Sequence, residues 1–157
     1  MTNQYKYRPA TLSDYQQLLV LLPQLADFEI PAQRIAKDLW EGDAKLLKAA
    51  LQEKAAIRFA DVAVAQDDQI VGLILVTVRE EMLSGQPSAH LETIIVAPTA
   101  RGQGLGRALL QRAEEKAKSL GAQSMSLHVF FKNMRARSLY QSSGYDEEIL
   151  RCIKWFD

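Results

Sequence analysis

The sequence predicts an α/β fold of the mixed α+β kind, with a central, twisted, mostly antiparallel sheet of about six to seven strands flanked by about four helices. At 157 residues the chain has the size of one domain, so we expect a single domain over residues 1–157. The Val- and Ile-rich runs Ile57–Ala65 and Ile70–Val78 flank the polar turn Gln66–Gln69 and predict an antiparallel hairpin. A strand, a glycine-rich turn and a helix follow, and this crossover adds a parallel pair of strands.

The first elements follow from alternation and capping signals. Tyr5–Arg8 alternates and stops at Pro9, which predicts a short strand. Thr11–Asp14 resembles a capping box with Asp in place of Glu. A helix is expected from this capping box to Pro23, because apolar residues recur at helical spacing. They are Leu12, Tyr15, Leu18, Leu19 and Leu22.

Two helical pieces are expected before the hairpin. Leu25–Pro31 is interpreted as a connector, and Gln33–Trp40 and Asp43–Lys54 as helices separated by Gly42. Asp43 is a residue type that commonly caps a helix N-terminus, so we expect it to cap the second piece.

The second half begins with a loop at Glu80–Ser88 and a buried strand at Leu91–Val96, which is rich in β-branched residues and ends before Pro98. The apolar residues of Leu105–Leu120 share one helical face, and Gly121 is a helix stop.

The chain then predicts a strand at Ser124–Val129 and a helix at Asn133–Ser143, which ends at Gly144. Tyr145 and Ile149–Phe156 are expected to supply the last strands.

Charge is balanced overall, with 19 basic and 19 acidic residues, which argues against a nucleic-acid binder or a polybasic membrane anchor. The charges are nevertheless segregated. Residues 98–137 carry eight basic and two acidic residues, whereas residues 23–97 carry seven basic and twelve acidic ones. A basic half suits a polyanionic cofactor and an acidic half suits a cationic substrate, although solvated faces that differ by chance would look the same.

The one cysteine, Cys152, excludes an internal disulfide and a cysteine metal cluster, and we expect it to be a buried, inert thiol. Met1–Arg8 lacks a signal-peptide core, and no apolar run approaches the roughly 20 residues of a membrane span. We therefore expect a cytoplasmic protein with no membrane partner. His90 and His128 fall on adjacent strands but lack a third ligand type at metal spacing, so no metal site is predicted and hydrogen-bonded structural histidines are favoured.

Gly102, Gly104 and Gly106 lie between the strand Leu91–Val96 and the next helix. Glycine lets the backbone approach a ligand closely, and the first N–H groups of a helix lack partners, so this arrangement favours an anion site. A dinucleotide fingerprint is excluded, because its third glycine would fall on Arg107 or Leu109, and a P-loop is excluded because Lys-Ser/Thr is absent after the turn.

What remains, Arg101-x-x-Gly104-x-Gly106, resembles the acyl-CoA pyrophosphate motif of the GNAT acetyltransferase superfamily. Asn133-x-x-Ala136-x-x-Leu139-Tyr140 is similar to the Asn-x-x-Ala-x-x-Leu-Tyr helix of that family, and Gly144-Tyr145 stands in the place of its Gly-Phe. The match covers residues 91–145 closely and the whole chain in the order of its elements.

This resemblance implies a GNAT-like domain that uses acetyl-CoA as cosubstrate. The loop Gly102–Gly106, with Gln103 and Leu105 inside it, would hold the phosphates through backbone N–H groups, with Arg101 and Arg107 adding charge. The pantetheine arm would pair with backbone groups of Ile94, Ile95 and Val96, as an extra strand would, and would contact Asn133 beside the small gap at Ala136.

The resemblance also implies the catalytic groups. Tyr140, seven residues after Asn133 on the same helical face, would be the general acid toward the leaving thiolate, and a packed aromatic role is the alternative. Glu92 lies on a mostly buried strand, where desolvation would raise the pKa of a carboxylate and suit it to accept a proton from an ammonium. An ion-paired Glu92, or a base acting through water, stays open.

These features predict an acetyl-CoA-dependent N-acetyltransferase that acts on a primary amine by direct attack on the thioester. A small-molecule amine and a protein N-terminus or lysine both remain open. Two groups of acidic residues suit a cationic substrate. One is the run Asp146–Glu148, and the other consists of Asp27, Glu29, Asp38, Glu41 and Asp43. A non-catalytic acyl-CoA sensor or structural domain with the same fold is the competing hypothesis, and a homodimer is left open.

Overall fold

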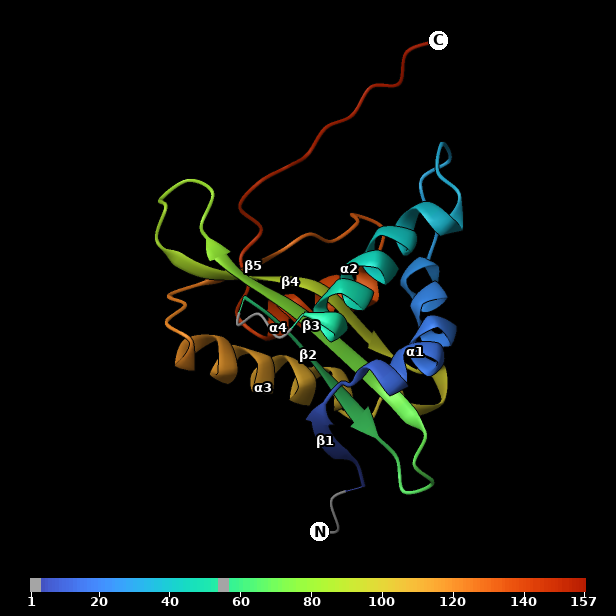
Figure 1. The fold of residues 1–157 in the computed structure, drawn as a ribbon. Coiled ribbons are helices and arrows are strands. Elements are labelled where there is room, and N and C mark those ends of the chain that lie inside the picture. Colours follow the sequence, from blue (N-terminus) through green and yellow to red (C-terminus); the bar gives the residue numbers. More distant parts are fainter. Residues whose placement is uncertain (1–3, 54–56) are drawn as a thin grey trace.

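The computed structural model describes residues 4–53 and 57–157, which form one mixed sheet with helices on both faces (Figure 1). The sheet has five strands in the order β1-β2-β3-β4-β5. The first four are antiparallel neighbours, and β4 and β5 are parallel. The strands are β1 (Lys6–Pro9), β2 (Arg58–Val64), β3 (Ile70–Glu80), β4 (Pro87–Val96) and β5 (Met125–Leu127).

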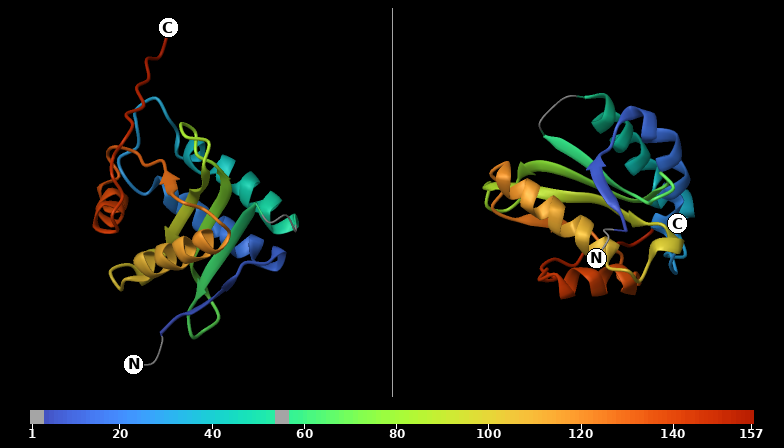
Figure 2. Two further views of the ribbon diagram at one scale, coloured as in Figure 1. Left: turned by 90° about the vertical axis from the view of Figure 1, so that its left-hand side faces the viewer. Right: turned by 90° about the horizontal axis from the view of Figure 1, so that it is seen from below.

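Four α-helices cover the sheet, two on each face. Helices α1 (Tyr15–Leu21) and α2 (Glu41–Gln52) lie on one face, and α3 (Leu105–Ser119) and α4 (Met134–Ser142) lie on the other (Figure 2). Short 3-10 turns, η1 (Leu12–Asp14), η2 (Leu22–Ala26), η3 (Ala36–Leu39) and η4 (Pro98–Ala100), connect or extend the helices. The predicted mixed fold class is confirmed.

Each face of the sheet has its own hydrophobic core. The core under α3 and α4 includes Leu109, Leu110 and Ile74, which have no exposed surface. The core under α1 and α2 is formed around Leu18, Leu22, Leu47, Leu73 and Leu75, which are also fully enclosed. Strand β3 contributes to both cores because its alternate side chains point to opposite faces.

The N-terminal capping box is confirmed. The Thr11 backbone N–H donates to Asp14 Oδ2 at 2.8 Å, and Arg8 Nη1 donates to the same oxygen at 2.7 Å. The bond from Arg8 is the main cause that lowers the pKa of Asp14, against the effect of burial. This pair fixes the chain between β1 and α1.

The sequence overestimated the number of strands. The chain from Gly144 to Asp157 has no regular structure, and it runs away from the body of the protein (Figure 1). The predicted strands at Tyr145 and Ile149–Phe156 are therefore absent from the sheet. The expected burial of Cys152 is also wrong, because that residue lies exposed in this segment.

The region before the hairpin differs as well. The predicted helix Gln33–Trp40 is only the 3-10 turn η3, while α2 begins at Glu41 and includes Gly42. Asp43 lies in the first turn of α2 and is not its N-cap. The predicted helix end at Lys54 falls outside the described residues.

The predicted loop Glu80–Ser88 is shorter than expected, because β3 extends through Glu80 and β4 starts at Pro87.

Candidate active site

Strand β4 contains a β-bulge at Glu92. Leu75 of β3 pairs with Thr93 and the next residue, Val76, pairs with Leu91, so Glu92 has no partner on β3. A bulge reverses which side chains face each side of the sheet. Before the bulge Leu91 packs in the core under α3, and after it Ile95 packs in the core under α1 and α2. Glu92, half-buried, lies at this reversal.

The bulge is also where β4 and β5 separate. Their pairing covers only Ala89–Leu91 on β4 and Met125–Leu127 on β5, although β4 continues to Val96. Among the described residues, the β5 side of β4 therefore has no strand partner beyond Leu91. An extended molecule with alternating donors and acceptors can pair with such an edge, as a strand would.

The orientation of the β4 backbone shows which residues face the open edge. The Ala97 N–H donates to Val71 O at 2.8 Å, so Ala97 and, by alternation, Ile95 direct their backbone groups toward β3. Ile94 and Val96 direct theirs the other way. Consistent with this, Val96 O accepts a hydrogen bond from Arg101 Nε at 3.1 Å. Three residues were expected to pair with a pantetheine arm. The backbone groups of Ile95 point to β3 and away from the open edge, the carbonyl of Val96 is bonded to Arg101, and Ile94 keeps both its N–H and its C=O available.

The glycine loop has the backbone geometry of an anion site. Gly102 and Gly104 have φ values of 73° and 77°, in the left-handed region that favours glycine, and a Cβ atom built on either would meet no atom within 4 Å. The first intrahelical bond of α3 runs from the Ala108 N–H to Gly104 O. The preceding N–H groups at the start of this 15-residue helix consequently lack helical partners.

Gly106 brings three elements together. A Cβ atom built on it would lie 3.4 Å from Leu139 Cδ2 of α4 and 3.7 Å from Val96 Cγ2 of β4. The start of α3, the open edge of β4 and the helix that carries Tyr140 thus converge at one place. The three sequence motifs are neighbours in the folded protein.

Both arginines of the loop are bonded within the protein. Arg101 Nη1 donates to Asp27 Oδ2 at 2.7 Å and Nη2 to Gln24 Oε1 at 3.2 Å. Arg107 donates to the carbonyl and the hydroxyl of Ser142, at the end of α4. The free backbone N–H groups, rather than the guanidinium groups, are left to contact a phosphate.

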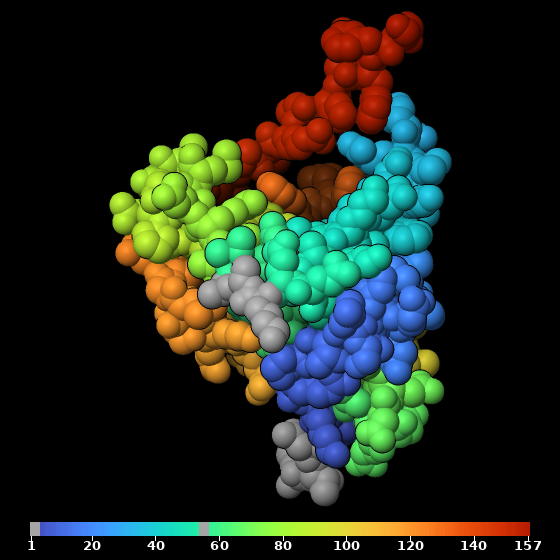
Figure 3. All heavy atoms as spheres, viewed as in Figure 1, coloured from blue at the N-terminus to red at the C-terminus, as the bar shows by residue number. Residues whose placement is uncertain are grey.

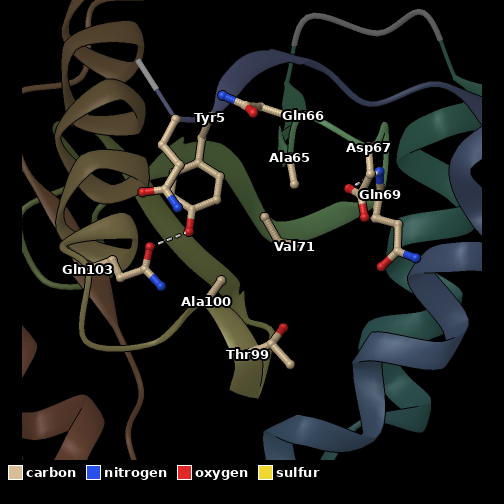
Figure 4. A pocket seen from close by; sticks show the side chains of 10 residues that line it. Tyr5, Ala65, Gln66, Asp67, Gln69, Val71, Thr99, Ala100 and Gln103 are labelled. Carbon is tan, nitrogen blue, oxygen red and sulfur yellow. Dashed lines mark hydrogen bonds between the residues drawn. The ribbon is translucent and has the colours of Figure 1, made fainter. Parts of the chain in front are cut away.

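The side chains of Gln103 and Leu105 point away from the expected phosphate position. Gln103 Oε1 accepts a hydrogen bond from the Tyr5 hydroxyl at 2.6 Å, beside a polar cavity of about 610 Å³ (Figure 4). Leu105 is buried, with 2% of its surface exposed. The cavity is lined by the chain just before β1, the β2–β3 turn, η4 and Gln103, and neither Glu92 nor Tyr140 lines it.

Asn133 caps helix α4. Its Oδ1 accepts a hydrogen bond from the Ala136 N–H at 3.3 Å, so this residue has a structural role that the sequence analysis did not predict. The amide NH₂ group of Asn133 is not needed for the cap and stays available as a donor.

Tyr140 is buried at the C-terminal half of α4, with 8% of its surface exposed. Burial raises the pKa of its hydroxyl to about 12, so the group is protonated at neutral pH. The neighbouring Tyr145 donates from its hydroxyl to Glu114 Oε1 at 2.8 Å. Tyr140 therefore has the protonation state that a proton donor requires.

A second carboxyl group accompanies Glu92. Burial, and after it the negative charge of Glu92, raise the pKa of Asp43 to about 6. Asp43 projects from the first turn of α2, whereas Glu92 lies at the bulge of β4. The sequence analysis missed this pairing, although Ala44 and Leu47 beside Asp43 indicate a helix face that turns toward the core.

Most of the other acidic residues expected to attract a cation are already bonded. Asp27 pairs with Arg101 and Arg135, Glu29 with Lys132, and Glu41 with Lys37. Asp38 accepts from the Ile35 N–H, and Glu147 is bound by Arg137. Within the described part of the chain, Asp43 and Glu92 form no ion pair, so their charge is left for a ligand.

His90 lies near Glu92 on β4, and His128 packs against His90. Their ring centroids are 4.8 Å apart, and His90 Nδ1 is 2.8 Å from Ser126 Oγ. Burial, followed by the charge of Arg79, lowers the pKa of His90 to about 4, so the ring is neutral at physiological pH. A neutral, hydrogen-bonded histidine agrees with the structural role that the sequence favoured.

A hollow opens between the β3–β4 turn, α2 and the C-terminal segment, with the chain around α4 at its back (Figure 3). No group of three or more His, Cys, Asp or Glu residues in the described ranges could hold a metal ion. Within the same ranges, no helix is long and apolar enough to cross a membrane.

Comparison with known proteins gives three consistent matches. The family model described as the acetyltransferase (GNAT) family matches residues 23–145. An uncharacterised N-acetyltransferase of Bacillus subtilis, YhfO, is 30% identical over 142 residues, which are 90% of this chain and 89% of the relative. The aminoalkylphosphonate N-acetyltransferase of Salmonella typhimurium is 26% identical over 94% of this chain and 88% of its own length.

The fold also matches solved structures. The structure of AAC(6')-Iy, in complex with the bisubstrate analogue CoA-S-monomethyl-acetylneamine, superimposes with a TM-score of 0.70. The match covers 98% of this chain and 97% of that one at 22% identity.

Proposed function

The chain belongs to the GNAT acetyltransferase family, and from this premise we propose that it transfers an acetyl group from acetyl-CoA to a cationic primary amine. The observation that carries the proposal is the convergence at Gly106 of the glycine loop, the open edge of β4 and the helix of Tyr140. A carrier bound along that edge has its phosphates at one end and its thioester near the bulge.

The chain can bind the carrier mainly through its backbone. The N–H groups at the start of α3 suit the phosphates, and the outward backbone groups of Ile94 suit an amide-bearing arm. The open space beside Gly102 and Gly104 leaves room for the close approach that phosphates need. Bound acetyl-CoA would supply a thioester, which an amine can attack directly, so no protein nucleophile is required.

Asp43 and Glu92 are the groups that we assign to the amine. Two carboxyl groups without an internal ion pair attract an ammonium, and the one that is ionised can accept its proton before attack. The raised pKa of Asp43, about 6, means that this carboxyl group changes its charge just below neutral pH. Glu92 keeps the role of base. Asp43 is assigned to binding, because its negative charge attracts the ammonium group toward Glu92.

Tyr140 is the group that we assign to the leaving thiolate. A phenol with a pKa of about 12 is protonated throughout the working range, and it can donate to a sulfur that gains negative charge. Tyr140 follows Leu139, whose side chain lies beside Gly106 at the start of α3, and this neighbourhood supports the assignment.

The deciding experiment measures thiol release from acetyl-CoA with a panel of amines. The panel includes aminoalkylphosphonates and aminoglycosides, because proteins named for these substrates resemble this chain. Polyamines and N-terminal peptides complete it. We expect thiol release above the hydrolytic background with at least one amine that carries a positive charge. Tight binding of acetyl-CoA without thiol release from any amine would favour the non-catalytic sensor.

A further inference from the structure

An unpaired positive charge lies at the base of the β3–β4 turn. Arg79, near the end of β3, is exposed, and in the described part of the chain its guanidinium group forms no hydrogen bond or ion pair. The acidic residues that follow it are placed elsewhere. Glu80 points to the opposite face by strand alternation, and the carboxylate of Glu81 accepts hydrogen bonds from N–H groups inside the turn. The charge of Arg79 is therefore available to a ligand.

Arg79 faces the same side of the sheet as Asp43. Leu75 packs in the core under α1 and α2, and Val78 packs against the core under α3. Strand alternation therefore directs Thr77 and Arg79 toward the side of α2. Asp43 projects from the first turn of α2. The hollow described above lies between the β3–β4 turn and α2 (Figure 3), so Arg79 and Asp43 belong to elements that border it.

Thr77 supplies a second polar group next to Arg79. It lies two residues before Arg79 on the same face and directly opposite His90 of β4. Thr77 has 8% of its surface exposed, and its Oγ1 atom is buried without a hydrogen-bond partner among the described residues. An unpaired buried hydroxyl is unfavourable, and most such groups in proteins are bonded to protein, water or ligand. The hydroxyl of Thr77 can donate to an acceptor that Arg79 also binds, and an acidic group is such an acceptor.

Opposite charges flank His90. Burial, the larger cause, and the charge of Arg79 lower the pKa of this ring, while the charge of Glu92 raises it, so both charged groups lie near the ring. Arg79 pairs with Ser88, two residues before His90 on β4, whereas Glu92 follows His90 by two residues. The four steps from Ser88 to Glu92 span roughly 13 Å of extended strand. The surface thus has a positive end at Arg79 and a negative end at Glu92.

We propose that the acceptor amine is a zwitterion, whose ammonium group lies at Asp43 and Glu92 and whose acidic group lies several bonds away, at Arg79 and Thr77. The inference rests on the proposed function, which assigns the ammonium group to the two carboxyl groups. A guanidinium group binds a carboxylate through paired N–H donors, and the hydroxyl of Thr77 adds a further donor. A second ammonium group at this position would be repelled by Arg79, so a diamine is disfavoured. An ω-amino acid has the required charges at its two ends.

The test measures thiol release from acetyl-CoA with matched amines. A series of ω-amino carboxylates of increasing chain length is compared with n-alkylamines and diamines of equal length. We expect kcat/KM for the best ω-amino carboxylate to exceed that for its alkylamine and its diamine by at least roughly tenfold, the effect of about one charge contact. Equal values, or a preference for the diamine, would overturn this inference while the acetyltransferase function stands.

Substitutions at Arg79 identify the group responsible. Arg79→Gln should raise KM for the ω-amino carboxylate at least roughly tenfold and leave kcat and the alkylamine reaction nearly unchanged, because the lost contact is made equally before and during the reaction. Arg79→Lys keeps the charge and should restore part of the preference. The control, Lys118→Gln, removes an equal charge from the exposed surface of α3, on the other side of the sheet, and should change neither reaction. Equal effects of Arg79→Gln and Lys118→Gln would show that net charge sets the preference, which overturns the proposal.

Thr77→Val replaces the hydroxyl with a methyl group of similar shape. We expect a higher KM for the ω-amino carboxylate and an unchanged KM for the alkylamine, while Tm stays the same or rises because an unpaired buried polar group is removed. An unchanged KM for both amines would overturn the placement of the acidic group beside Thr77.

Calorimetric titration of the same amines into the protein with CoA gives a measurement that does not depend on turnover. Tighter binding of the ω-amino carboxylate than of the alkylamine, without thiol release from any amine, would support this inference and contradict the proposed function. Binding of the two amines with equal affinity would overturn the inference, whatever the outcome for thiol release.

Discussion

The ring of Tyr140 meets the ring of Tyr145 edge to face, with the two centroids 5.9 Å apart. The surroundings of their hydroxyl groups differ. Tyr145 donates to Glu114, whereas burial is what raises the pKa of Tyr140. The two residues therefore provide a matched pair in which the same atom can be removed from a group assigned to catalysis and from one assigned to structure.

Tyr140→Phe should keep the packed ring and remove only the proton donor. We expect acetyl-CoA affinity within about twofold of the wild type and turnover lowered by roughly 10²-fold. The control, Tyr145→Phe, should keep turnover and lose about 1–2 kcal/mol of unfolding free energy with its hydrogen bond to Glu114. Calorimetry, thiol-release kinetics and denaturant unfolding measure the three quantities. Equal turnover in Tyr140→Phe and the wild type would end the general-acid assignment.

Gly104→Val should weaken acetyl-CoA binding by at least roughly tenfold, because the new side chain would occupy the open space beside the free N–H groups. Gly121 is a matched control at the opposite end of α3. It also has a positive φ, 95°, and open space around a built Cβ. Gly121→Val should thus cause comparable backbone strain with no loss of affinity, as measured by calorimetry. Equal losses in both variants would mean that strain, not the phosphate site, is responsible.

Glu92→Gln should lower turnover by roughly 10²-fold at neutral pH if Glu92 accepts the proton of the amine. Turnover should recover partly as pH rises, because a larger fraction of the amine is then already deprotonated. The pH dependence of kcat/KM, measured for the variant and the wild type, tests this. A profile that keeps the wild-type shape and height would remove Glu92 from the mechanism.

Asp43→Asn should change the pH dependence of both binding and stability. The raised pKa, about 6, means that Asp43 is protonated below that pH and ionised above it. In the wild type, KM for a cationic amine should fall by roughly tenfold as pH rises through 6, the effect of about one charge contact. The variant should lack this fall. The control, Glu41→Gln, removes an equal charge two residues away, from the pair with Lys37, and should keep the pH-dependent fall in KM.

The stability effect of Asp43 has a definite sign. The folded protein binds this proton more tightly than the unfolded chain does, so stability falls as pH rises from about 4 to 6. Asp43→Asn should therefore raise Tm relative to the wild type at pH 8 and leave Tm nearly unchanged at pH 4. Thermal unfolding at the two pH values checks this, and an equal difference at both would contradict the assignment of the raised pKa to Asp43.

Arg101→Lys keeps a positive charge and loses the planar fork that bonds Asp27, Gln24 and Val96 O. We expect Tm to fall by a few degrees, with about 1 kcal/mol lost from a partly exposed network, and acetyl-CoA affinity to change by less than about twofold. A tenfold loss of affinity at unchanged Tm would instead show that Arg101 contacts the phosphates, as the sequence motif suggested.

The parts of the fold that sequence reasoning predicted well are those with a local signal. The hairpin at Gln66–Gln69, the helix of Leu105–Leu120 and the glycine loop each depend on periodicity or turn residues in one stretch of chain. The strand propensity of Ile149–Phe156 was also local, but whether a segment joins a sheet depends on partners that propensity does not specify.

The candidate site was predicted less completely for the same reason. Its three motifs were identified from their spacing, and the structure shows that they meet at Gly106. Arg101 and Asp27, which form an ion pair, are 74 positions apart in the sequence. Asp43 on helix α2 and Glu92 on strand β4 are also distant in the sequence but close in the fold. A pattern within one short stretch of sequence cannot indicate contacts between residues so far apart.

At Glu92 the backbone and the side chain have separate effects: the extra backbone residue forms the bulge, and the side chain supplies the carboxylate. The extra residue shifts the phase of the strand, so that Leu91 and Ile95 face opposite cores. That shift depends on the number of residues and not on the carboxylate, so substitutions at position 92 can alter the chemistry while the fold persists. Deleting the residue would remove the bulge, because Leu91 and Thr93 already pair with the consecutive residues Val76 and Leu75, so Ile94 and Ile95 would keep their sides of the sheet. The extra residue is therefore not needed for the pairing of the sheet, and what it contributes is a side chain at the point where β4 and β5 separate.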